Sequence, residues 1–141
     1  MSEYHELKTE YKDRDCLVEA LNDAGYKTVE VSETPLPLYD YTGRQTHYLD
    51  KTGDKANVIV RRKYIGGMPN DLGFAKQADG TYSAIVSDYD SSKHNKGWFN
   101  NLRKSYVEKV DIKTAAKQGF KFLRKENVGK KVVLRFLDTR A

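Results

Sequence analysis

The amino-acid sequence predicts an α+β fold: a single two-layer domain with a mostly antiparallel sheet and two or three helices on one face. Two segments place apolar residues at the period of a helix, and several short segments alternate between apolar and polar residues. An Asp-Gly pair between two alternating segments indicates a hairpin. Helices with one apolar stripe bury it against a sheet. Since 141 residues without an internal repeat are typical of one domain, residues 1–141 are assigned to a single α+β domain.

A strand over residues 4–11 and a helix over residues 14–24 open the predicted fold. The strand follows from a loose alternation, and the helix from an apolar stripe. Asp13 suits the N-cap of this helix, and Gly25 fits the left-handed position after its last turn. The stripe consists of Leu17, Ala20, Leu21 and Ala24.

Residues 27–33 predict a second strand, which Pro35 and Pro37 are expected to end because proline lacks a backbone N–H. A long connection follows over residues 35–54, in which residues 45–49 are a candidate short strand. Long loops are often functional, although the tyrosines of this one are also suited to cover a sheet edge. These tyrosines are Tyr39, Tyr41 and Tyr48.

Three further strands are predicted over residues 57–65, 72–77 and 81–87. Residues 66–71 form the loop between the first two. Asp79 and Gly80 lie between the other two, and an Asp-Gly pair in this context is the strongest short-range signal of a hairpin.

The C-terminal third predicts helical structure followed by a hairpin. Residues 96–106 have helical periodicity, but it is open whether the helix continues through residues 107–110 or Asp111 caps a second helix. Residues 120–125 and 132–137 predict two final strands. The residues that carry the helical periodicity are Trp98, Leu102, Tyr106, Ile112, Ala115 and Ala116.

Four pieces of the chain, in this order, resemble one family. They are residues 5–25, residues 72–88, Tyr106 before a helical stretch that ends in Gln-Gly-Phe at residues 118–120, and Val-Leu-Arg-Phe at residues 133–136. The chain is similar to the uncharacterised hypothetical chloroplast reading-frame family, a domain of unknown function in algal plastids, cyanobacteria and cyanophages. The resemblance implies a photosynthetic host or its phage. It supplies no activity, cofactor or catalytic residue.

Basic and acidic residues are distributed unevenly along the chain. The total of 25 basic and 20 acidic residues gives a net charge of +5. Residues 1–92 hold 11 basic and 16 acidic residues, whereas residues 93–141 hold 14 and 4. A segment of +10 suggests a polyanion as partner, although such charge is more often a solvated face. The candidate contacts to nucleic acid are Arg61, Arg62 and Lys63 beside Tyr64, and Arg103, Lys104, Lys109, Lys113 and Lys117 on the helical stretch.

No catalytic or metal-binding motif is present, and we expect no cofactor and no metal. The three histidines lack the spacing of zinc ligands, and no glycine-rich phosphate loop occurs. Leu72 stands where an RNA-recognition octamer needs a basic residue before Gly73. Cys16 lies in the first turn of a predicted helix, where a helix dipole lowers a thiol pKa, but a small core residue is the simpler interpretation. An enzyme with a dispersed site would use Asp88, His94 and Tyr106.

The sequence therefore favours a small non-enzymatic binding protein that acts through a protein partner. The first alternative is a nucleic-acid-binding protein that uses the basic C-terminal third, and the second is an enzyme with an unrecognised site. No apolar run spans a membrane, and the N-terminus has no apolar region typical of a secretory signal. Because a single cysteine precludes an intrachain disulfide, we expect a cytoplasmic location, a plastid stroma or the cytosol of an infected host.

Overall fold

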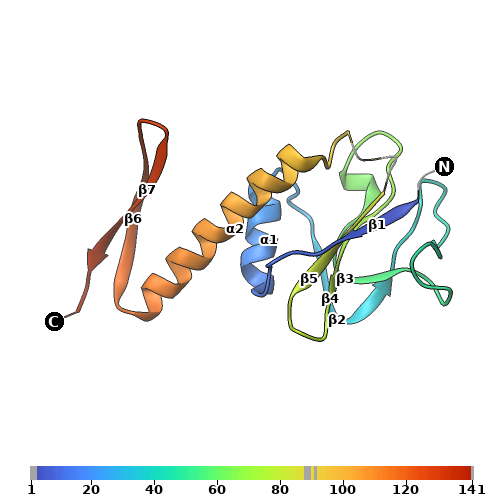
Figure 1. The fold of residues 1–141 in the computed structure, drawn as a ribbon, viewed down its shortest axis with the longest axis horizontal. Coiled ribbons are helices and arrows are strands. Elements are labelled where there is room, and N and C mark those ends of the chain that lie inside the picture. The colour runs from blue at the N-terminus through green and yellow to red at the C-terminus, as the bar shows by residue number, and fades with distance from the viewer. Residues whose placement is uncertain (1–2, 88–89, 91, 141) are drawn as a thin grey trace.

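The strands form two separate antiparallel sheets in the computed structural model, which describes residues 3–87, 90 and 92–140 (Figure 1). Two α-helices accompany them, so the α+β prediction is confirmed. In chain order the elements are β1 (Tyr4–Leu7), α1 (Arg14–Asp23), β2 (Glu30–Pro37), β3 (Lys55–Val60), a 3-10 helix η1 (Arg62–Tyr64), β4 (Leu72–Lys76), β5 (Tyr82–Ser87), α2 (Lys96–Lys117), β6 (Phe120–Val128) and β7 (Lys131–Asp138).

The larger sheet has five strands in the order β1-β5-β4-β3-β2. The strands β2 to β5 follow one another as neighbours, and β1 lies at the far edge beside β5. Both helices cover one face of this sheet, as predicted. The core between them and the sheet includes Leu17 and Leu21 of α1, Leu102 of α2, and Val58 and Phe74 of the sheet.

Helix α1 begins where the sequence predicts and ends one residue earlier than predicted, at Asp23, because its caps are local. The Asp13 carboxylate accepts a hydrogen bond from the Cys16 backbone N–H at 3.0 Å. Gly25 has a φ of 104°, a conformation that favours glycine, and the chain turns there towards β2. The buried residues are Cys16, Leu17, Ala20 and Leu21, whereas Ala24, which the sequence placed in the stripe, lies just after the helix and is exposed.

Helix α2 is continuous over 22 residues, so the alternative of a second helix capped by Asp111 is wrong. It begins at Asn95, whose side chain accepts the Trp98 N–H at 2.9 Å. The Tyr106 hydroxyl accepts the backbone N–H groups of Lys12 and Asp13, both at 2.9 Å. This contact joins the middle of α2 to the start of α1.

The second face of the five-stranded sheet is covered by the loop after β2, which lies between residues 38 and 54. Leu38 is fully buried in a small apolar cluster with Tyr4, Ile59 and Ile85. The loop is held by Asp54, which is 1% exposed and accepts three backbone N–H groups at 2.8–2.9 Å. The loop therefore belongs to the packed structure and covers a sheet face rather than an edge.

Gly73 of β4 provides the space for this packing. A Cβ atom at Gly73 would lie 2.8 Å from the Ala56 Cβ and 3.0 Å from a Leu38 methyl group. We expect Gly73→Ala to lower the free energy of unfolding by about 1–3 kcal/mol, because added methyl groups strain a packed core. Gly97→Ala is the matched control, and near the start of α2 it is expected to raise stability by up to about 1 kcal/mol. Urea denaturation measures both, and equal effects would contradict this account of Gly73.

Several strand predictions are wrong in part. The strand predicted over residues 4–11 ends at Leu7, and the one predicted from residue 27 begins at Glu30. Strand β2 continues through Pro35 and Pro37, because an edge strand that pairs only with β3 tolerates residues without an N–H. Residues 45–49 form no strand, only a bridge between Tyr39 and Gln45. Strand β3 ends at Val60, and the predicted strand residues after it turn into η1.

The predicted C-terminal hairpin exists but lies apart from the five-stranded sheet. Strands β6 and β7 pair only with each other and project from the far end of α2 (Figure 1). Outside the hairpin itself, their extensive contacts are with α2 alone. The expectation that one sheet holds all the strands is therefore wrong, because α2 is long enough to place the hairpin beyond the core.

Candidate functional site

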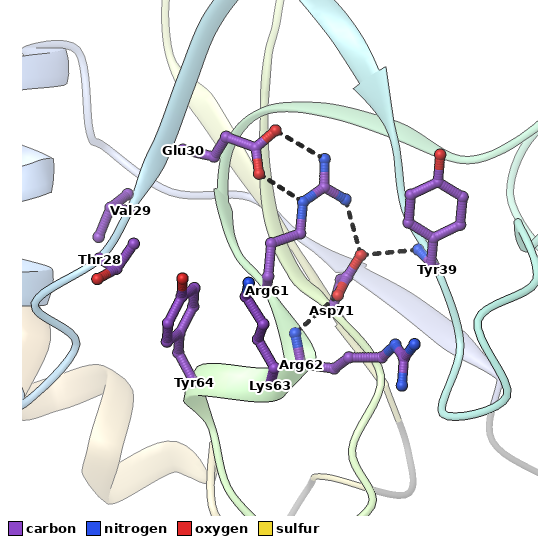
Figure 2. A pocket seen from close by; sticks show the side chains of 9 residues that line it. All are labelled: Thr28, Val29, Glu30, Tyr39, Arg61, Arg62, Lys63, Tyr64 and Asp71. Carbon is purple, nitrogen blue, oxygen red and sulfur yellow. Dashed lines mark hydrogen bonds and ion pairs between the residues drawn. The ribbon is translucent and has the colours of Figure 1, made fainter.

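A pocket of about 510 Å³ opens beside β2 and η1, and Figure 2 shows the residues that line it. It contains the three basic residues that the sequence placed beside Tyr64. The lining residues are Thr28, Val29, Glu30, Tyr39, Arg61, Arg62, Lys63, Tyr64 and Asp71.

Arg61 is held by ion pairs on two sides of its guanidinium group (Figure 2). Its Nε and Nη2 atoms donate to the two oxygens of Glu30 at 2.7 and 3.1 Å. Its Nη1 atom donates to Asp71 at 2.8 Å and to the Pro37 carbonyl at 2.7 Å. The bonds to Glu30 raise the pKa of Arg61 further, and Arg61 lowers the pKa of Glu30. Arg61 is thus a fixed part of the pocket wall.

Asp71 joins three segments of the chain beneath the pocket. Its carboxylate is 1% exposed. Besides Arg61, it accepts the backbone N–H groups of Tyr39 and Arg62, both at 2.8 Å. The loop after β2, the end of β3 and the start of η1 are therefore held in one arrangement.

Arg62 and Lys63 differ from Arg61, because neither has a carboxylate within 4.0 Å among the described residues. Arg62 donates one weak bond to the Tyr41 carbonyl at 3.3 Å. The Lys63 ammonium lies over the Tyr64 ring, 4.9 Å from its centroid. With three cations and two carboxylates, the pocket lining has a net charge of +1.

The basic residues predicted on the helix do not join this pocket. Lys109 pairs with Asp23 at 2.8 Å and Lys113 pairs with Asp13 at 2.6 Å, so both connect α2 to α1. Arg103 lies 3.8 Å from Glu10 at a second groove, beside β1. Lys104 and Lys117 have no carboxylate partner within the part of the chain that is described. Contact of these residues with nucleic acid stays a prediction.

The hairpin β6–β7 with the two residues that follow it, residues 120–140, is called the arm. It holds seven basic and two acidic residues, a net charge of +5. Four of the cations are paired: Arg124 and Arg135 with Glu126, Arg140 with Asp138, and Lys125 with Glu108 of α2. The other three, Lys121, Lys130 and Lys131, have no carboxylate partner within the described ranges.

Apolar side chains occur on both faces of the arm. Phe122 and Phe136 are cross-strand partners with ring centroids 5.9 Å apart. Because side chains alternate along a strand, Leu137 lies on the opposite face from Phe136. No described residue after Tyr106 is buried. Four apolar residues of the arm are about half exposed: Leu123 at 48%, Val128 at 52%, Val132 at 51% and Leu137 at 50%.

The residues named for a dispersed enzyme site have separate surroundings. The Tyr106 hydroxyl already accepts two backbone N–H groups just before α1. His94 is 4% exposed, donates to or accepts from the Tyr26 hydroxyl at 2.7 Å, and lies against Trp98. Asp88 lies outside the described residues. Burial raises the pKa of Cys16 to about 11, which is opposite to an activated thiol.

Five of the nine lining residues were not among the contacts predicted from the sequence: Thr28, Val29, Glu30, Tyr39 and Asp71. Asp71 was placed in a loop, where an aspartate is usually a turn residue. The only sequence signal for its role was its position directly before the buried strand β4. A carboxylate at such a position is expected to be buried, and buried carboxylates need partners. Within the described ranges, no three potential metal ligands cluster, and no helix is long and apolar enough to cross a membrane.

Comparison with protein-family models gives a match. A family model described as "Protein of unknown function (DUF1257)" matches residues 20–134, which include the pocket and most of the arm. No curated protein and no solved structure matches the chain significantly.

Proposed function

The chain belongs to the DUF1257 family of proteins of unknown function, and from this premise we propose that it is a small binding protein without enzymatic activity. Its arm docks onto a partner protein, at a surface that combines carboxylates with apolar side chains. The observation that supports this proposal most is the half-exposed apolar surface of an arm that no other sheet covers.

A hairpin of two strands is marginally stable in water unless another element covers it. Among the described residues, no strand pairs with either outer edge of the arm, and neither apolar face belongs to one of the two core clusters. Exposed edges of this kind are templates for pairing with another chain. A partner that covers one face would bury Leu123 and Leu137 or Val132 and Leu134.

Charge indicates which kind of surface the partner presents. The arm has a net charge of +5, and Lys121, Lys130 and Lys131 at its base and tip have no partner in the described chain. Complementary charge speeds association and fixes orientation more than it adds affinity. An acidic rim around an apolar centre therefore fits the arm.

A protein fits this surface better than a nucleic acid does. Phosphate contact needs free cations, and four of the seven cations of the arm are already paired within the chain. On α2, Lys109 and Lys113 are paired as well. The half-exposed leucines and valines gain nothing from a phosphate backbone.

The test compares two double variants of the full chain. Leu123→Ser with Leu137→Ser removes apolar contacts from the arm, at residues that are 48% and 50% exposed. Val31→Ser with Leu49→Ser removes two apolar residues from the body that are 40% and 44% exposed. In extracts of a photosynthetic host, we expect the arm variant to capture at least about tenfold less partner than the wild-type chain does, because the two leucines belong to the desolvated centre of the interface. The body variant keeps it.

Equal capture by both variants would overturn the proposal. So would capture that disappears on nuclease treatment and falls steeply with salt, since that result identifies a nucleic acid. Light scattering of the purified chain shows whether the partner is a second copy. Circular dichroism confirms that both variants fold.

We also propose a location and a host. A single cysteine that is buried suits a reducing compartment: the cytoplasm, a plastid stroma or the cytosol of an infected host. The resemblance of the sequence to plastid, cyanobacterial and cyanophage proteins suggests a photosynthetic host. Fractionation of host cells with an antibody against the chain tests both points.

A further inference from the structure

The pocket beside η1 has the dimensions of a ligand site. Its volume of about 510 Å³ falls within the range of about 300–1,000 Å³ that is typical of small-molecule sites. It lies on the body of the protein, lined by residues of β2, η1 and the adjoining loops, and contains no residue of the arm (Figures 1 and 2). Its function is thus separable from that of the arm.

Both carboxylates of the pocket form ion pairs with Arg61, whereas the other two cations of the pocket, Arg62 and Lys63, form none among the described residues. Both oxygens of Glu30 and one oxygen of Asp71 accept from Arg61. Arg62 and Lys63 keep most of their donors for a ligand. A phosphate group offers several charged acceptor oxygens, which arginine and lysine bind through strong hydrogen bonds.

The backbone that presents these two cations is fixed. The Arg62 N–H donates to Asp71 at 2.8 Å, and the Tyr64 N–H donates to the Arg61 carbonyl at 2.9 Å in η1. Binding therefore orders side chains only, which lowers its entropic cost.

Aromatic rings supply a second kind of contact. Tyr64 is 43% exposed, and its hydroxyl has no partner in the described structure. Tyr39 lines the opposite side of the pocket, where the Arg61 guanidinium lies 5.3 Å from its ring centroid (Figure 2). Such rings suit a planar group that is carried next to a phosphate.

We infer that this pocket binds a phosphate monoester that carries a planar ring, the chemistry of a nucleotide. Lys63, which lies over Tyr64, holds the phosphate together with Arg62. The Arg62 guanidinium turns from the Tyr41 carbonyl towards the phosphate, and Tyr64 contacts the ring. Two sources share this chemistry: a free mononucleotide and the 5′-terminal nucleotide of a strand.

Calorimetric titration of the full chain tests the inference with AMP, inorganic phosphate and adenosine. We expect AMP to bind more tightly than phosphate, and adenosine to bind at least about tenfold more weakly than AMP, because it lacks the charged group. A 5′-phosphorylated oligonucleotide that binds more tightly than AMP identifies a strand end as the source, and weaker binding identifies the free nucleotide.

Matched variants assign the binding to the pocket. Arg62→Gln with Lys63→Gln is expected to weaken AMP binding about tenfold or more. Lys55→Gln with Lys76→Gln makes the same change of charge on exposed strand residues and is expected to leave it unchanged. Tyr64→Ala should weaken AMP binding but not phosphate binding. Thermal unfolding confirms that each variant folds.

Three results would overturn the inference: no AMP binding at about 10 mM, adenosine binding as tightly as AMP, or equal losses in the two charge variants. The arm variant Leu123→Ser with Leu137→Ser should bind AMP normally. Failure of the pocket to bind is thus distinguishable from failure of the arm to dock.

Discussion

Replacing Asp71 by asparagine is expected to lower the free energy of unfolding by about 3–5 kcal/mol, the cost of breaking a buried ion pair. Asp71 is 1% exposed and bonds to Arg61, whose side chain is 18% exposed. The amide keeps one acceptor oxygen for the two backbone N–H groups that now use both oxygens. The Arg61 guanidinium then keeps Glu30 as its only carboxylate partner among the described residues, and one backbone N–H group loses its acceptor away from water. Urea denaturation measures the loss.

Glu30→Gln is the matched control, because Glu30 pairs with the same guanidinium from a side chain that is 46% exposed. Exposed ion pairs contribute about 0–1 kcal/mol, so this variant should unfold at nearly the wild-type urea concentration. Combining Asp71→Asn with Arg61→Met should cost less than the sum of the two single changes, since the double variant leaves no buried unpaired charge and the Glu30 carboxylate that it frees is 46% exposed. Equal losses for Asp71→Asn and Glu30→Gln would contradict the structural role assigned to Asp71.

Stability is expected to fall by about 3 kcal/mol between pH 6.5 and pH 4, because of His94. Burial lowers the pKa of His94 from 6.5 to about 4, and the Lys93 ammonium adds to the shift. In this interval the unfolded chain binds a proton on this residue and the folded chain does not. The stability is therefore fully present above pH 6.5 and is lost as the pH falls towards 4.

His94→Phe isolates this effect, because phenylalanine keeps the contact with the Trp98 ring, whose centroid is 4.5 Å away. Urea denaturation of the wild-type chain and of His94→Phe at several pH values measures the difference in their free energies of unfolding. Asp90 nearby acts in the opposite direction, since burial raises the pKa of its carboxyl, but it is present in both proteins. If the two stability curves stay parallel from pH 6.5 to 4, the assignment to His94 is wrong.

Local signals explain what the sequence predicted correctly. The N-cap Asp13, the stripe of α1 and the Asp-Gly turn between β4 and β5 act over a few residues, and each element formed where these signals placed it. The helical period of residues 96–106 likewise predicted the first half of α2.

Interactions between distant residues explain the rest. Strand β2 continues through its prolines because it lies at a sheet edge, which no local pattern reveals. Lys113 and Asp13 pair across 100 positions of the sequence, a contact between two helices that no local pattern reveals. The role of Asp71 depends on Arg61, Tyr39 and Arg62, which become neighbours only in the folded chain.

The arm could be predicted as a hairpin but not as a separate sheet. Its residues pair locally, whereas its distance from the core follows from the continuous length of α2. Its apolar residues would have been assigned to the core by their pattern alone. Their exposure is the reason for assigning the arm to a partner protein.

Photo-crosslinking in an extract of a photosynthetic host tests the central claim most directly. A photoreactive amino acid replaces Val132 in the arm or, as a control, Lys76 at the end of β4. We predict one nuclease-resistant protein adduct from position 132 and none from position 76. An excess of the unlabelled wild-type chain should abolish the adduct by competition. The same excess of the unlabelled variant Leu123→Ser with Leu137→Ser should not. An adduct only from position 76, or nucleic acid as the crosslinked species, would contradict the account.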